Sequence, residues 1–386
     1  MAAPVSRIGV LDGFRTMAIL LVVGFHYGVR WTQPWSDDNL YPHGDLFAGN
    51  LVLKYGWAAV ELFFMMSGFV ILLTLERCDS LPDFLRKRIA RLWPALILCA
   101  AITTVSLGVF GPKAWVKDPL SFVLSILFID PEVFQPLVHG RDIGWIDGAY
   151  WTLAVEMRFY LLVGAVFLAG RRRFLAAWLG VQLVSFALGS PWLASVPELY
   201  WPRALLMPVY LPYFTLGICF FEVFRAKAWR LLPTAGVVAS ICMILVNAGL
   251  WGAFRARGET LPVLAINGLW IGLFWLFVID SPLVRPFALK PLARLGESSY
   301  SLFLLHEAAG IALMNALTAL GSPPLVTLAV VLALMIGASM LIFRFVEEPA
   351  KGWLLKRSKG LSTGASKRMP WLNYGPPLTQ PQPQPV

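Results

Sequence analysis

Charged side chains are scarce in this sequence. Only 14% of its 386 residues are Asp, Glu, Lys or Arg, whereas 58% are hydrophobic. A soluble domain carries far more charge on its surface, so the composition excludes a soluble globular protein. Runs of roughly twenty apolar residues recur along the whole chain instead, which is typical of a helical protein with several membrane-spanning segments.

Cysteine and histidine are also rare, with four of each. The cysteines form no CxxC pair, so neither a disulfide framework nor a zinc site is indicated. The histidines are scattered without ligand spacing, which gives no reason to predict a metal ion. The net charge of +10 arises from cations in short loops between apolar runs. Nucleic acid is therefore not a predicted partner.

The apolar runs predict an all-α, polytopic membrane protein with about ten transmembrane helices. The first is expected to be retained rather than cleaved as a signal peptide, because no small-x-small site follows its apolar core. Residues 1–350 are expected to form one membrane domain, and residues 351–386, rich in Ser, Lys, Pro and Gln, a disordered cytoplasmic tail. The expected spans are 16–31, 51–75, 92–110, 149–169, 174–190, 204–223, 232–251, 261–280, 298–318 and 324–346.

The distribution of Lys and Arg predicts the orientation of these spans. Cations are several times more frequent in the two terminal segments and in the loops after spans 2, 4, 6 and 8 than in the other loops. Because positive loops stay on the cytoplasmic side, both termini are expected in the cytoplasm. We expect the membrane to be the inner (plasma) membrane of a bacterium.

The stretch Leu11–Val29 is almost wholly apolar but contains Arg15 and His26. Eleven residues of helix turn through about 1100°, so the two side chains lie roughly 20° apart on one face and about 16 Å apart along the axis. An ionisable group inside a membrane is costly and points to function. The alternative is a snorkelling Arg and a packed, hydrogen-bonded His.

Four further segments place polar groups in or beside spans. Ser67 lies next to Gly68 in FFMMSGF, a pattern that also suits close helix packing. Arg88 and Arg91 lie one helical turn apart and suit an anionic ligand such as a phosphate or nucleotide, with anionic lipid headgroups as the alternative. Two more ionisable groups, Glu156 and His306, lie inside spans 4 and 9. Glu156 and its neighbour Arg158 face different ways and are expected to contact other helices.

The first outside loop, residues 32–50, contains no Lys or Arg. Its Trp and acidic side chains could stack on and hydrogen-bond a sugar, or could form an aromatic belt with solvated charges. The residues concerned are Trp31, directly before this loop, and Trp35, Asp37, Asp38, His43 and Asp45.

Six segments together resemble the integral-membrane acyltransferase-3 family. The order and spacing of the segments carry the resemblance, which runs from span 1 to span 10 but leaves the middle spans unmatched. The segments are LDGFR with His26 ten residues beyond Arg15, FFMMSGF, RIARLWP, WTLAVEMRFY, SYSLFLLHE and RFVEEPA.

This resemblance implies transfer of an acyl group, most often acetyl, from cytoplasmic acyl-CoA (acetyl-CoA) to a hydroxyl of a carbohydrate or lipid-linked sugar. Arg15, Arg88, Arg91 and Ser67 would then bind the donor. His26 would act as general base, with His306 as a second candidate base. Glu156 would orient His26 or the acceptor.

Two alternatives stay open at this point. His26 could form an acyl-imidazole in a two-step transfer. Intramembrane charges would also suit a transporter or flippase of a sugar or polyprenyl-linked substrate.

Overall fold

The structure, a computed structural model, describes residues 7–31, 46–47, 49–112, 115–138, 140–251 and 258–358. Within these ranges the chain is helical and contains no strand, which confirms the predicted all-α class. The outer-loop residues from Trp35 to Asp45, singled out above for sugar contacts, lie outside the described residues. The elements are α1 (Arg7–Gly28), α2 (Leu51–Lys54), η1 (Gly56–Ala58), α3 (Ala59–Leu75), α4 (Leu81–Phe110), α5 (Pro119–Ile126), α6 (Pro131–Phe134), η3 (Gln135–Leu137), η4 (Gly148–Tyr150), α7 (Trp151–Ala169), η5 (Arg171–Arg173), α8 (Phe174–Leu188), α9 (Pro191–Ala194), η6 (Pro197–Leu199), α10 (Tyr200–Leu206), α11 (Leu211–Ala226), α12 (Leu231–Val246), η7 (Asn247–Trp251), α13 (Thr260–Val278), η8 (Pro282–Ala288), α14 (Lys290–Glu297), α15 (Ser299–Leu305), α16 (Ala308–Ala319), α17 (Pro324–Ile342), η9 (Phe343–Glu347) and α18 (Glu348–Ser358).

The structure supports the predicted polytopic fold with about ten transmembrane helices. Among the described residues, eight helices are long and apolar enough to cross a membrane, and the bent pair α15–α16 makes a ninth. The predicted span 174–190 is α8, a helix of 15 residues, whose length of about 22 Å falls short of the roughly 30 Å hydrocarbon core. Helix α8 ends at Leu188 with Gly189 as its C-cap, two residues before the end of the predicted span.

Two predicted boundaries also move. Helix α4 begins at Leu81, not near residue 92, because its charged first turns stay helical after a Ser80 cap whose hydroxyl accepts from the N–H of Asp83. At the other end, α18 continues to Ser358, so the expected tail from residue 351 starts inside a helix. In both places a charged segment that hydropathy alone would exclude extends an apolar helix.

Helices α3 and α11 cross in close contact in the core. A methyl group on Gly68 would overlap the carbonyl oxygen of Phe214, and one on Gly217 would overlap that of Met65. Small residues on both sides therefore let the two backbones touch, as is typical of membrane helices. Close helix packing, the alternative considered for the FFMMSGF segment, is thus what Gly68 does. The neighbouring Ser67 lines a cavity instead.

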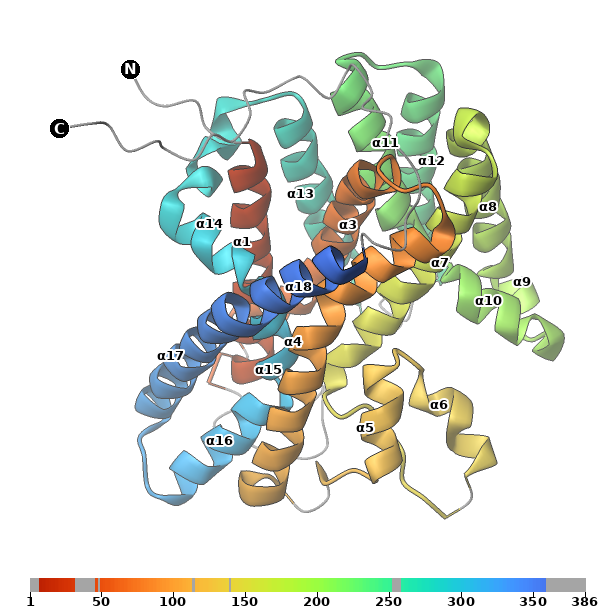
Figure 1. The fold of residues 1–386 in the computed structure, drawn as a ribbon. Helices are drawn as coiled ribbons and strands as arrows, with labels where there is room; N and C mark the ends of the chain where they lie inside the picture. The colour runs from red at the N-terminus through yellow and green to blue at the C-terminus, as the bar shows by residue number, and fades with distance from the viewer. Residues whose placement is uncertain are drawn as a thin grey trace.

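The helices are arranged so that chain connections alternate between two ends of the bundle. Helix α1 begins at the end where the α11–α12 connection lies, and the α16–α17 connection lies at the opposite end (Figure 1). We call the first of these the inner end. It holds the cation-rich turns that the sequence predicts to be cytoplasmic.

Candidate functional site

The first helix turns both of its ionisable groups into the protein. Helix α1 is continuous from Arg7 to Gly28, so Arg15 and His26 share a face as predicted. The His26 side chain is only 12% exposed, and its Nδ1 lies 2.9 Å from the carbonyl oxygen of Val22. Arg15 pairs with Asp12 at 2.5 Å and lines two cavities. Neither side chain is turned out to lipid.

An open cleft at the inner end holds the predicted guanidinium groups. Its volume is about 610 Å³, and it lies between α1, α3, α4 and the α17–α18 rod. Its wall carries as many carboxylates as cations. An incoming anion would therefore compete with these carboxylates for the cations of the wall. The charged lining residues are Arg15, Arg88, Arg91, Lys351, Asp12, Glu297, Glu347 and Glu348.

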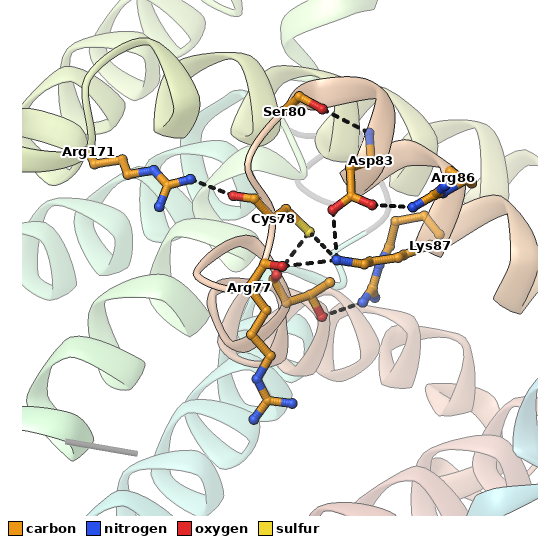
Figure 2. A network of polar contacts seen from close by, with 9 residues as sticks. Arg77, Cys78, Ser80, Asp83, Arg86, Lys87 and Arg171 are labelled. Carbon is orange, nitrogen blue, oxygen red and sulfur yellow. Dashed lines mark hydrogen bonds and ion pairs between the residues drawn. The ribbon is translucent and has the colours of Figure 1, made fainter. Parts of the chain in front are cut away.

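A network at the α3–α4 turn fixes this part of the cleft (Figure 2). Arg88, which is buried, donates to the hydroxyl of Thr74. Lys87 donates to the carbonyl oxygen of Arg77 at 2.9 Å and to Asp83 at 2.7 Å. The turn is thereby tied to α4 one residue before Arg88. Arg88 and Arg91 therefore line the cleft, whereas Lys87 stabilises the α3–α4 turn.

The thiol inside this turn is shielded. Cys78 is 1% exposed, and its Sγ lies 3.3 Å from Nζ of Lys87. Burial raises the pKa of the Cys78 thiol, although the Lys87 ammonium opposes that shift. A protonated, buried thiol is a poor nucleophile, so Cys78 is a structural member of the turn.

A buried cavity lies beyond the cleft and shares part of its wall. Arg15, Val70 and Arg91 line both spaces. The buried cavity has a volume of about 100 Å³, and apart from these residues its lining is mostly apolar. Two donors that line it, Ser67 and Tyr160, both donate hydrogen bonds to Glu156. A path from the inner end thus leads past two guanidinium groups to a carboxylate.

The prediction that Glu156 and Arg158 contact different elements is confirmed. Glu156 is held by Ser67 of α3, whereas Arg158 lies 3.2 Å from Asp130 and donates to the carbonyl oxygen of Ala204 at 3.1 Å. Arg158 is therefore a structural residue at the outer half of α7.

His26 lies in a second polar cluster with a different set of partners. Nε2 of His306 lies 3.2 Å from Nδ1 of His26, and Oε1 of Glu307 lies 3.5 Å from Nε2 of His26. The two candidate bases are therefore neighbours. Glu156 is predicted to orient His26 or the acceptor. Its hydrogen bonds come from Ser67 and Tyr160 and not from His26, so orienting the acceptor stays a prediction.

Two aromatic rings in the wall of the buried cavity lie near the histidine pair, and the ring centroid of Phe303 is 5.5 Å from that of His306. Phe63 and Phe303 both line the cavity, and their ring centroids are 6.3 Å apart. The Phe303 carbonyl oxygen lies 2.8 Å from Nδ1 of His306. His26 is not among the residues lining the cavity. The cavity that Arg15 lines therefore does not extend to His26.

Sequence reasoning missed three groups at these sites. Tyr160 follows Glu156 by one helical turn, a spacing that could have indicated their contact. Glu307 adjoins His306 in the sequence but carried no predicted role. Asp147, whose carboxylate accepts from the N–H of Ala308 at 2.8 Å, gives no signal beyond its place just before a span. No cluster of three or more metal-ligand side chains occurs in the ranges that the structure describes.

Comparison with known proteins relates the chain to acyltransferases. Residues 8–344 match the acyltransferase-3 family, described as an acyltransferase domain. An O-acetyl transferase of Shigella phage Sf6 is 29% identical over 161 residues, covering 40% of this chain and 44% of that protein. No solved structure matches the chain significantly.

Two longer alignments involve further O-acetyltransferases. The peptidoglycan O-acetyltransferase OatA of Listeria monocytogenes is 24% identical over 379 residues, covering 88% of this chain and 55% of that protein. The O-acetyltransferase OatA of Staphylococcus aureus (strain NCTC 8325) is 23% identical over 381 residues, covering 88% of this chain and 57% of that protein. The chain spans about half the length of these curated relatives.

Proposed function

This chain belongs to the acyltransferase-3 family, and from that premise we propose that it is a membrane O-acyltransferase. It moves an acetyl group from acetyl-CoA, bound at the cytoplasmic face, to a hydroxyl of a carbohydrate or lipid-linked sugar. The names of its relatives, O-acetyltransferases, with peptidoglycan in one of them, support the acetyl group and the carbohydrate acceptor. A bacterial inner membrane is the proposed location.

The observation that carries this proposal is the shared wall of cleft and cavity. Arg15 and Arg91 border both spaces, so phosphates bound in the cleft would leave the thioester arm at the entrance of the cavity. Guanidinium groups bind phosphate oxygens through paired, charge-assisted hydrogen bonds. Arg88, tied to Thr74, completes the cationic side of the cleft. Ser67 lies farther along the same route.

The histidine cluster supplies the proton chemistry. His26 takes the proton of the acceptor hydroxyl while the oxygen attacks the thioester carbonyl. The carbon–sulfur bond then breaks, and the thiolate receives that proton. Since the ring of Phe303 lines the cavity and contacts the ring of His306, it must move aside for the thioester to meet His26. We propose direct transfer, and not an acyl-imidazole, as the reaction course.

Thiol release from acetyl-CoA by the purified protein in nanodiscs tests the proposal, with peptidoglycan fragments as acceptor probe. The wild type should release CoA and form acetylated product. His26→Ala should lose about 100-fold or more of that rate, while Leu20→Ala, on the lipid side of the same helix, should retain it. Undiminished transfer by His26→Ala would remove His26 from the mechanism.

Two further measurements separate the open alternatives. Intact-protein mass spectrometry after acid quench should show no acetyl group on the enzyme, whereas an adduct on His26 would establish the two-step course. If acetyl-CoA does not bind at all, the donor assignment is wrong and transport of a sugar becomes the better hypothesis. Comparison of surface glycans with and without the gene would identify the acceptor by the acetyl groups lost.

A further inference from the structure

The break between α15 and α16 creates the surroundings of His26. The two helices are bent by 57°, and His306 and Glu307 occupy the break. Asp147 stabilises it from another segment: its Oδ2 accepts from the N–H of Ala308 at 2.8 Å, and its Oδ1 accepts from the N–H of Ala149 at 2.9 Å. One carboxylate thus caps the start of α16 and joins it to the start of α7.

The carboxyl group of Glu307 packs directly against Gly148, the residue after Asp147. A methyl group on Gly148 would lie 2.8 Å and 2.9 Å from the two carboxylate oxygens of Glu307. The side chain of Glu307 is 5% exposed, and its Oε2 is buried without a hydrogen-bond partner. The local packing therefore holds this carboxyl group in one place, with Oε1 directed to His26.

Backbone carbonyls determine which ring nitrogens carry hydrogen. Nδ1 of His26 lies 2.9 Å from the oxygen of Val22, and Nδ1 of His306 lies 2.8 Å from that of Phe303. Because a carbonyl can only accept, both Nδ1 atoms bear the proton in the neutral rings. Nε2 of His26 is then the basic nitrogen, and it lies 3.5 Å from Glu307.

We propose that Glu307 is the charge partner of His26 and sets its basicity during acyl transfer, an inference that rests on the proposed function. Two acceptor atoms, Nε2 and Oε1, face each other until a proton arrives. When the acceptor O–H bond breaks, the proton goes to Nε2, and the carboxylate stabilises the imidazolium. The proton then leaves with the thiolate once the carbon–sulfur bond has broken. Glu307 acts through His26 and is a positioning residue.

Three other groups face this pair. The His306 ring contacts His26 as a neutral hydrogen-bond partner, while Arg30 adds a positive charge that acts on both His26 and Glu307. Burial, and then the charge of Glu307, raise the pKa of Asp147 well above its ordinary value. The two carboxyl groups therefore favour a single negative charge between them. Once Nε2 of His26 is protonated, the imidazolium favours that charge on Glu307, which lies 3.5 Å from it.

Solid-state nitrogen NMR of histidine-labelled protein in liposomes tests this role without any acceptor. The chain has four histidines, so His26 is assigned by comparison with His26→Gln. We expect its neutral ring to carry hydrogen on Nδ1. In Glu307→Gln its titration midpoint should fall by about one pH unit or more, because the imidazolium loses a neighbouring negative charge.

Two variants keep the test decisive. Glu307→Asp retains the charge and should keep the midpoint near that of the wild type. Glu61→Gln is the matched control, because Glu61 lies on α3, has a buried carboxylate oxygen without a partner and is outside this cluster. An Nε2–H tautomer for His26, or an unchanged midpoint in Glu307→Gln, would overturn the proposal.

Turnover then relates this role to the reaction. The acid limb of kcat/KM for acetyl-CoA should move to lower pH in Glu307→Gln, with kcat reduced about tenfold or more and KM little changed. A purely structural role would lower activity at every pH alike. If the wild type transfers no acetyl group but the NMR shift occurs, the proposed function fails and the role of Glu307 in setting His26 basicity stands.

Discussion

At the scale of single residues, Arg91 connects the two spaces on which the function depends. It lines both the cleft at the inner end and the buried cavity. Its charge also acts on Glu347, which accepts a hydrogen bond from Ser301 at 3.0 Å. A phosphate that enters the cleft would exchange this internal partner for a ligand. Arg91 should therefore affect donor binding more than the chemical step.

Arg91→Ala should raise KM for acetyl-CoA about tenfold or more with little change in kcat, because one charge-assisted hydrogen bond contributes about 1.5–3 kcal/mol. Steady-state kinetics of thiol release measure both constants. Arg172→Ala removes an exposed cation at the same end of the bundle, away from the cleft, and should leave KM as it is. An equal rise in both variants would indicate general surface attraction instead of a binding site.

The two donors to Glu156 make a second residue-scale prediction. Ser67→Ala and Tyr160→Phe each leave the carboxylate with one hydrogen bond fewer, and each should slow transfer about tenfold. The double variant should deviate from additivity, since both hydroxyls share one acceptor. Tyr200→Phe, an exposed tyrosine, is the matched control. Strict additivity would mean that Glu156 does not couple the two donors.

At the scale of elements, the α3–α11 crossing supports the cavity wall. Ser67 and Gly68 are adjacent on α3, so the residue that faces the cavity is held by the residue that touches α11. The crossing depends on contact between a glycine and a backbone carbonyl, which no larger residue can make without separating the helices.

Gly68→Ala should destabilise the protein by about 1–3 kcal/mol, as overpacking does in well-packed cores, and should lower Tm in detergent. Gly180→Ala on α8, where a methyl group would meet nothing within 4 Å, should leave Tm close to that of the wild type. Thermal unfolding followed by tryptophan fluorescence compares the two. Equal Tm values would show that the crossing can relax around a methyl group.

At the scale of the whole molecule, orientation in the membrane determines which substrate meets which cavity. The cleft is lined by Asp12, Thr74 and Arg88, near the start of α1, the end of α3 and the start of α4. Helix α1 begins at the inner end, where the α11–α12 connection also lies (Figure 1). The cation bias of the loops predicts that this end is cytoplasmic. Acetyl-CoA, a cytoplasmic molecule, would then have direct access to the cleft.

A membrane-impermeant maleimide applied to whole cells tests this orientation. A cysteine in place of Asp142, whose side chain is 79% exposed at the outer end, should be labelled. One in place of Lys356, exposed on α18, should react only after the cells are opened. Both are made in a Cys242→Ser background, because Cys242 is the exposed cysteine of the native chain. The reverse pattern would place the cleft outside.

The sequence by itself determined the class of protein and which polar side chains share a face of a helix. Apolar runs specify membrane helices because lipid leaves backbone groups no other partner, and the 3.6-residue period placed Arg15 and His26 on one side of α1. It also indicated Arg88 and Arg91 as a pair. At α8 the helix is two residues shorter than the predicted span, because hydropathy registers apolar length but not the exact residue at which a helix is capped.

Only the tertiary structure decided which of these faces meet. His306 lies 280 residues from His26 in sequence and 3.2 Å from it in space, and Glu307, not Glu156, completes that cluster. Helical periodicity gives the direction of a side chain relative to its own axis, but its partners depend on how separate helices pack and where one of them breaks. The glycine contacts, the bend at residues 306–307 and the aromatic pair in the wall of the cavity are properties of that packing.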